Sequence, residues 1–185
     1  MKKFETRDIV LVAMYVALAI VLDYVKEFLP FLNMPQGGSL NIALIPIVIG
    51  SFHLGFGYGA LIGLLWWGVS SLMGLNNDIV SPMQYVLDYI VPSVIIGLSS
   101  IFYRTSDDSK IKLIKMEVGI FLMMAIRTAS ICISGAYFWP GDAAAGSLAA
   151  WSGSLAYNLP YCIATGVMLM VLVPLAMTRI KTLIK

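Results

Sequence analysis

The sequence predicts an all-α membrane protein, a bundle of six transmembrane helices with both termini in the cytoplasm. Composition, segment length and the placement of charge carry this prediction. Of the 185 residues, 59% are hydrophobic and 12% are charged, whereas a soluble domain carries about 25% charged residues. The mean hydropathy is +0.88. A soluble core is therefore the weaker interpretation, and we expect one integral membrane domain over residues 1–185.

A helix needs roughly 20 mostly apolar residues to cross a bilayer, and six segments meet or approach that length. The chain begins Met-Lys-Lys, as signal peptides do, but no small-residue cleavage pattern follows, so we expect a retained first helix. The linkers are too short to form an extramembrane domain. The predicted spans are residues 9–29, 40–56, 57–75, 82–103, 116–139 and 154–180.

The basic residues predict the orientation of the bundle. They cluster before the first span, between the fourth and fifth spans, and after the sixth, and an even number of spans brings these clusters to one side. By the positive-inside rule that side is the cytoplasm of a prokaryotic plasma membrane. The clusters are Lys2, Lys3 and Arg7; Arg104, Lys110, Lys112 and Lys115; and Arg179, Lys181 and Lys185.

Three charged residues fall inside predicted spans. Asp23 has Lys26 and Glu27 within one turn, so we expect it at the outer membrane interface. Asp88 and Arg127 could pair across the fourth and fifth spans. Their estimated depths differ, however, which favours a separate role for Asp88. A carboxylate within a membrane is costly and by default indicates a functional site.

Polar and aromatic residues accompany Asp88 at the predicted outer helix ends. A carboxylate, several rings and a side-chain amide suit a flat, positively charged heteroaromatic ligand, because rings stack and add cation–π attraction. An interfacial aromatic belt is the alternative explanation for Trp139, Tyr157 and Trp151, but it does not explain Asp88. The candidate residues are Gln84, Tyr85, Asp88, Tyr89, Trp139, Tyr157 and Asn158.

Two sets of small residues recur at intervals of four, the spacing at which helices approach closely in lipid. For Gly55, Gly59 and Gly63 we expect packing within the chain. For Ala13 and Ala17 the pattern fits internal packing and docking onto a partner membrane protein equally well.

Four segments, "MPQGGSLNIALIPI", "SPMQYVLDYIVPS", "ISGAYFW" and "SLAYNLPY", resemble in order and spacing the thiamine-specific S component of energy-coupling factor (ECF) transporters. The resemblance covers essentially the whole chain. It implies a multi-pass cell-membrane protein that binds thiamine from outside with high affinity. It also implies transport with a separate ECF module, made of one transmembrane subunit and two ATPase subunits. Membrane lipid surrounds such a protein, and no cofactor and no nucleic-acid partner is expected.

The resemblance also implies roles for individual residues. Asp88 and Tyr89 match the family's acidic-Tyr pair, Trp139 its stacking aromatic and Asn158 the amide that reads the pyrimidine edge. The segment Gln36, Gly37 and Gly38 would cover the mouth of the pocket, and Ala13 and Ala17 would dock on the module.

Two positions depart from the family pattern. Ile131 stands where a His is usual, and Gly153 where a Tyr is usual, with Trp151 nearby to fill that space. A related vitamin, such as hydroxymethylpyrimidine or a form of vitamin B6, therefore stays open as the ligand.

Other function classes fit less well. An intramembrane enzyme needs a nucleophile with a base, or metal ligands, whereas His53 stands alone and Cys132 and Cys162 lack metal-ligand spacing. No enzyme and no metal site is expected. A self-sufficient carrier would need groups for ion coupling, and no internal repeat is detectable. No G-x-x-x-x-G-K-[ST] segment occurs, so ATP must be hydrolysed by another polypeptide.

Overall fold

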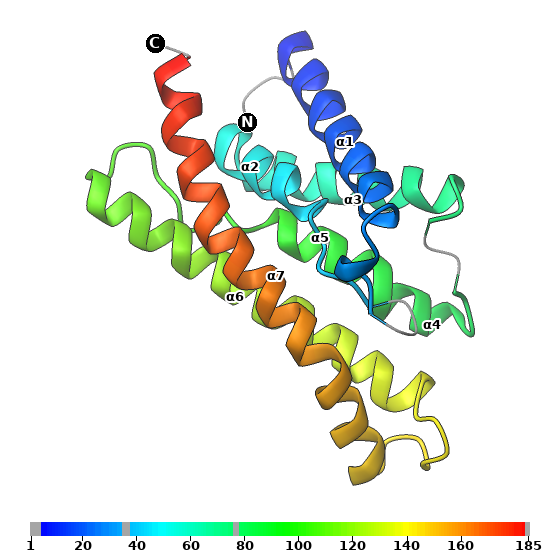
Figure 1. Ribbon diagram of the computed structural model, residues 1–185. Coiled ribbons are helices and arrows are strands. Elements are labelled where there is room, and N and C mark those ends of the chain that lie inside the picture. The colour runs from blue at the N-terminus through cyan, green and yellow to red at the C-terminus, as the bar shows by residue number, and fades with distance from the viewer. Residues whose placement is uncertain (1–4, 35–37, 76–77, 184–185) are drawn as a thin grey trace.

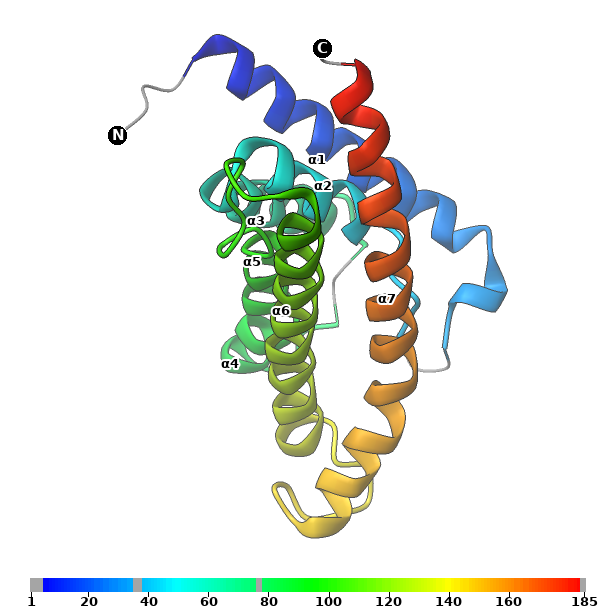
Figure 2. The same ribbon diagram turned by 90° about the vertical axis from the view of Figure 1, so that its left-hand side faces the viewer.

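The computed structural model describes residues 5–34, 38–75 and 78–183, except for the side chains of residues 180–183. These residues form helices joined by short loops, with α6 and α7 packed against each other (Figure 1). The beginning of α1 and the end of α7 lie at the same end of the molecule (Figure 2). The elements are α1 Thr6–Glu27, the 3₁₀ turn η1 Pro30–Leu32, α2 Leu44–Leu54, α3 Phe56–Leu72, α4 Pro82–Tyr85, the π-turn η3 Val86–Ile90, α5 Val91–Gly97, α6 Ser109–Phe138 and α7 Leu148–Leu183.

The predicted all-α class is confirmed. The segments α4, η3 and α5 follow one another without a break, so the described residues form six helices. Three of these are long and apolar enough to cross a membrane: Thr6–Glu27, Ser109–Phe138 and Leu148–Arg179. The predicted helix positions hold, but the bounds shift. The helix α6 begins seven residues before its predicted span, and α7 begins six residues before its own.

The second helix is shorter than predicted. Residues 40–56 were expected to span the membrane, whereas α2 contains eleven residues, or about 16 Å of helix. Polar contacts hold the irregular backbone before it: Asn41 N–H donates to Thr165 Oγ1 at 3.2 Å, and Ala43 N–H donates to Asn41 Oδ1 at 3.1 Å. Non-helical backbone at membrane depth requires such protein partners or a cavity beside it.

Glycines bring α3 and α5 into close contact. A Cβ atom on Gly63 would lie 2.0 Å from the Ser93 carbonyl oxygen, and one on Gly59 would lie 2.1 Å from that of Gly97. The predicted packing role is confirmed for these two glycines. Gly55 does not have this packing role, because no atom lies within 4 Å of its Cβ position. It lies in the turn between α2 and α3 and has a positive φ of 106°, which favours glycine.

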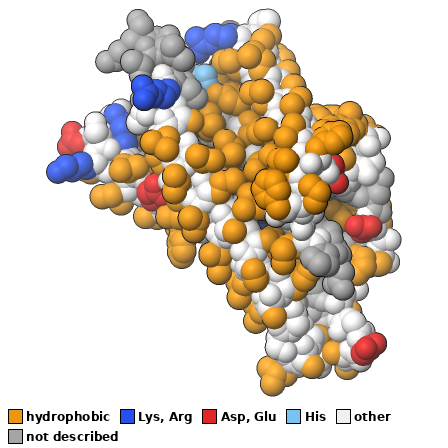
Figure 3. Space-filling view, in the orientation of Figure 1, with side chains coloured by type: hydrophobic (Ala, Val, Ile, Leu, Met, Phe, Trp, Pro, Cys, Tyr) orange, Lys and Arg blue, Asp and Glu red, His pale blue; other side chains and the backbone are white. Residues whose placement is uncertain are grey.

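The surface is strongly apolar, as expected of helices that face lipid. Large hydrophobic side chains cover much of the face seen in Figure 3. On α1, Ala13 and Ala17 are both exposed, and the residues that follow each of them, Met14 and Leu18, are exposed as well. The bundle is that of a multi-pass membrane protein.

Candidate functional site

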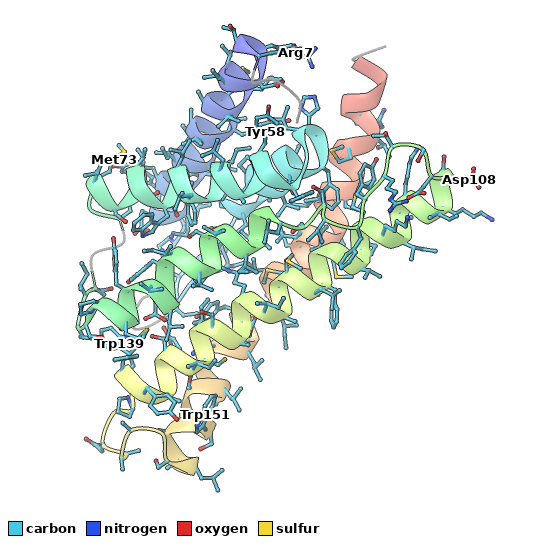
Figure 4. The ribbon with its side chains drawn as sticks, turned by 180° about the vertical axis from the view of Figure 1, so that it is seen from behind. Arg7, Tyr58, Met73, Asp108, Trp139 and Trp151 are labelled. Atoms are coloured by element: carbon cyan, nitrogen blue, oxygen red, sulfur yellow. The ribbon has the colours of Figure 1, made fainter. Side chains whose placement is uncertain are left out.

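A cavity of about 1100 Å³ lies within the bundle. This volume is slightly above the range of about 300–1000 Å³ typical of small-molecule sites. Its walls come from α1, α3, α5, α6 and α7, from η3, and from the loops that follow α1, α3 and α6. Trp139, which lines the cavity, lies in the half of the molecule away from Arg7 and Tyr58 (Figure 4).

Asp88 is placed by an irregularity in its helix. Pro92 has no N–H to donate to the Asp88 carbonyl one turn earlier, and its ring crowds that carbonyl. The helix widens there into the π-turn η3, in which Val91 N–H bonds to the Val86 carbonyl. Side-chain hydroxyls satisfy neighbouring carbonyls: Ser130 Oγ donates to Leu87 O at 2.7 Å. Such π-turns occur frequently at functional sites.

Two hydrogen bonds orient the Asp88 carboxylate. Gln84 Nε2 donates to Asp88 Oδ2 at 2.7 Å, and Trp139 Nε1 donates to the same oxygen at 3.1 Å. Gln84 is fully buried and also joins the preceding loop, by donating to Asp78 O and accepting from Val80 N–H. Within the described residues Asp88 forms no ion pair, so the alternative of an Asp88–Arg127 bridge is not seen.

One face of α6 lines the cavity from its inner part to its mouth. Arg127, Ile131, Gly135 and Trp139 all line it, and their spacing of four keeps them on the same side of the helix. Twelve residues separate the first from the last, about 18 Å of helix. This stripe of four residues on α6 therefore presents to the cavity, in order, a cation, an apolar side chain, a glycine and an aromatic ring.

The facing wall comes from α7 and the loop before α2. Asn158 is buried, and its amide donates to Ser154 O at 2.9 Å and to Ser154 Oγ at 3.2 Å. Its carbonyl oxygen accepts from the Tyr161 hydroxyl. Asn158 is thus held by protein groups, and a role in reading a ligand edge would require exchange of these bonds. Gly38 N–H donates to the Tyr157 hydroxyl at 2.9 Å, which ties the loop to this wall.

The structure brings six of the candidate side chains or backbone positions to the cavity and leaves others away from it. Gln84 acts through Asp88, while Tyr85 donates to Ser71 Oγ and packs against Tyr89. Trp151 packs edge-to-face against Tyr137 at 6.2 Å and does not fill the space beside Gly153. Gln36 and Gly37 lie outside the described residues. Those at the cavity are Gly38, Asp88, Tyr89, Trp139, Tyr157 and Asn158.

Asp23, which we expected at the outer membrane interface, is part of the cavity wall. Asp23 is 2% exposed and lines the cavity. Lys26 Nζ lies 3.1 Å from its Oδ1, and Trp66 Nε1 and Ser70 Oγ donate to its Oδ2 at 3.1 and 3.3 Å. The sequence shows Lys26 one turn away, but the partners on α3 lie more than forty residues along the chain.

Sequence reasoning also missed other cavity residues. Tyr161 follows Asn158 by three positions, so helical spacing places the two residues on one face and could have identified Tyr161. The sequence marks Arg127 as a charge at membrane depth, but the only partner that it suggests for Arg127 is Asp88. Other missed side chains carry no local signal that separates them from packing or loop residues, among them Trp66, Asn33, Asn41 and Asp78.

Comparisons with known proteins agree with this architecture. The chain is 37% identical over 158 residues to the thiamine transporter ThiT of Bacillus subtilis (strain 168), covering 82% of this chain and 80% of that protein. It is 24% identical over 201 residues to the pantothenic acid transporter PanT of Lactococcus lactis subsp. cremoris (strain MG1363), covering 96% and 93%.

A solved structure of ThiT from Listeria monocytogenes has the same fold, with a TM-score of 0.63, 20% identity, and coverage of 90% of this chain and 96% of that chain. The curated relatives are named as transporters, and the chain is not an enzyme. Residues 9–185 match the family described as thiamine transporter protein (Thia_YuaJ), and the chain belongs to that family.

Proposed function

We propose that this protein is the substrate-binding S component of an ECF-type importer, which captures thiamine from outside with high affinity and delivers it with a separate ATPase module. The observation that carries the proposal is the cavity beside Asp88, a carboxylate that no cationic side chain among the described residues neutralises. A cationic ligand would supply the missing charge.

The charges around the cavity support a cation. Four carboxylates line it, those of Asp23, Glu27, Asp78 and Asp88, against the cationic side chains of Lys26 and Arg127. Aromatic rings suited to stacking on a heterocycle accompany them, with Trp139, Tyr89 and Tyr157 among the lining residues. Thiamine combines a permanently charged thiazolium ring with a flat aminopyrimidine and so matches both features.

A related vitamin is the second candidate, because the relative PanT is named for pantothenic acid. Pantothenic acid is an anion at neutral pH, and the excess of carboxylates around this cavity disfavours an anion. Neutral or cationic precursors, such as hydroxymethylpyrimidine and pyridoxine, are compatible with the charge but leave part of the cavity empty.

Tryptophan fluorescence tests the ligand assignment. Trp139 lies at the cavity, so binding should change the emission of the purified protein. Titration with thiamine, hydroxymethylpyrimidine, pyridoxine and pantothenate should give saturation at the lowest concentration with thiamine. Equal or tighter binding of another of these compounds would reassign the ligand, and return of a chemically altered thiamine would contradict a transport role.

The docking role of Ala13 and Ala17 is tested separately. Both are exposed on an apolar face of α1, where two small residues let another helix approach closely. Ala13→Trp should preserve thiamine binding and abolish uptake by cells that also carry the ECF module. Ala125→Trp is a matched control, because Ala125 is exposed on α6 and offers the same apolar surroundings. Uptake by liposomes that contain this chain alone would contradict the need for a module.

A further inference from the structure

Arg127 is a cation at the cavity that forms no ion pair with any carboxylate of the described residues. It lies within the long helix α6, is mostly buried, and lines the cavity. In the part of the chain that the structure describes, no hydrogen bond or ion pair reaches its guanidinium. A guanidinium has five N–H donors in a planar fork and stays charged in proteins. Such a group at membrane depth needs acceptors from the cavity contents.

None of the four carboxylates that line the cavity, those of Asp23, Glu27, Asp78 and Asp88, forms an ion pair with Arg127 among the described residues. Asp23 is engaged by Lys26, Trp66 and Ser70. Asp88 is engaged by Gln84 and Trp139. Cys162, Tyr161 and Asp23 lie close enough to Arg127 to interact with it electrostatically. The Tyr161 hydroxyl donates its own proton to Asn158, and among the described residues none of the three accepts a hydrogen bond from the guanidinium.

We infer that Arg127 binds an uncharged hydrogen-bond acceptor of the ligand and thereby fixes which way round the ligand lies. This inference rests on the proposed function. A guanidinium repels the thiazolium ring, whereas Asp88 attracts it, so the two side chains favour one orientation of the ligand between them. Thiamine carries uncharged acceptors at both ends, the pyrimidine ring nitrogens at one and the hydroxyethyl oxygen at the other.

Two thiamine analogues identify the acceptor. One has both ring nitrogens of the pyrimidine replaced by CH, and the other has the hydroxyl replaced by chlorine. In the wild-type protein, removal of the acceptor that faces Arg127 should weaken binding by about 10- to 100-fold, as expected for a hydrogen bond to a charged group. If neither analogue binds more weakly than thiamine, the inference is wrong, and this result needs no variant protein.

The variant Arg127→Met completes a double-mutant cycle, in which one change is made in the protein and the other in the ligand. It should weaken thiamine binding by a similar factor, and the analogue that lacks the Arg127 acceptor should then bind as well as thiamine does. Arg127→Lys keeps the charge but loses the fork and should recover only part of the affinity. Arg104→Met, at an exposed loop position, removes the same charge away from the cavity and should leave binding unchanged.

The outcomes separate this inference from the proposed function. If the wild-type protein does not bind thiamine, the proposed function fails. If it does, but Arg127→Met binds thiamine and both analogues as the wild type does, Arg127 is only hydrated and the inference fails. Tighter binding of thiamine monophosphate than of thiamine, lost in Arg127→Met, would show an anion site and overturn the assignment to an uncharged acceptor.

Discussion

Replacement of Asp88 by Asn tests the central electrostatic argument. The change keeps the size of the side chain and an oxygen that can accept from Gln84 and Trp139, the donors 2.7 and 3.1 Å from Asp88 Oδ2. It removes the negative charge. Hydrogen bonds to charged groups contribute about 1.5–3 kcal/mol, so the dissociation constant for thiamine should rise by about 10- to 150-fold.

Asp88→Asn should lower the stability that bound thiamine adds to the protein, without lowering the stability of the ligand-free protein. A ligand stabilises the folded state in proportion to the logarithm of its concentration relative to the dissociation constant. At saturating thiamine, Asp88→Asn should therefore lose about 1.5–3 kcal/mol of ligand-induced stabilisation. The ligand-free protein should be at least as stable as the wild type, because a carboxylate without an ionic partner is costly within a membrane.

Isothermal titration calorimetry and thermal unfolding, each with and without thiamine, measure these two effects. Asp142→Asn is the matched control, since Asp142 is exposed in the loop between α6 and α7 and should leave both unchanged. An unaltered affinity in Asp88→Asn would refute the role of Asp88 as the counter-charge. A ligand-free Asp88→Asn that unfolds more readily would show that the charge serves the fold.

Three further predictions follow from the contacts around this site. Trp139→Phe keeps an aromatic ring but removes the 3.1 Å hydrogen bond to Asp88. Titration should show that the affinity for thiamine falls by roughly three- to tenfold. An unchanged affinity would show that this hydrogen bond does not contribute to binding. Gln84→Met removes three hydrogen bonds and should lower affinity and the melting temperature together, whereas a loss of affinity alone would indicate direct ligand contact. Gly63→Ala should destabilise the protein by about 1–3 kcal/mol in thermal unfolding, because its Cβ would overlap a carbonyl of α5; Gly68→Ala, with open space on the same helix, should not, and equal effects would exclude the close-packing argument.

Much of the fold follows from local sequence patterns. Hydropathy alone places six helices, because apolar runs of sufficient length must form helices in lipid to satisfy their own backbone. The spacing of Gly59 and Gly63 identifies a packing face, and Pro92 four residues after Asp88 marks the irregular turn. The sequence also selects Asp88, because a carboxylate in an apolar run has few structural explanations.

The helix bounds were less well determined. The apolar run of residues 40–56 is long enough to suggest a full span. Its first residues, before α2, form an irregular segment whose N–H groups bond to Thr165 and Asn41. Thr165 lies on α7, 124 residues away. Hydropathy registers the burial of such a segment and carries no information about distant hydrogen-bond partners.

The sequence by itself determined the class of protein and the number of helices, and it singled out Asp88, an acidic residue that lines the cavity. The tertiary structure alone decided which side chains share the cavity: it buried Asp23 against Trp66, turned Trp151 toward Tyr137, and among the described residues brought no ion-pair partner to Arg127. The physical reason is the distance along the chain over which sequence patterns carry information. Hydropathy and helical periodicity act over a few turns, whereas the charge balance of a cavity depends on groups that only helix packing brings within bonding distance.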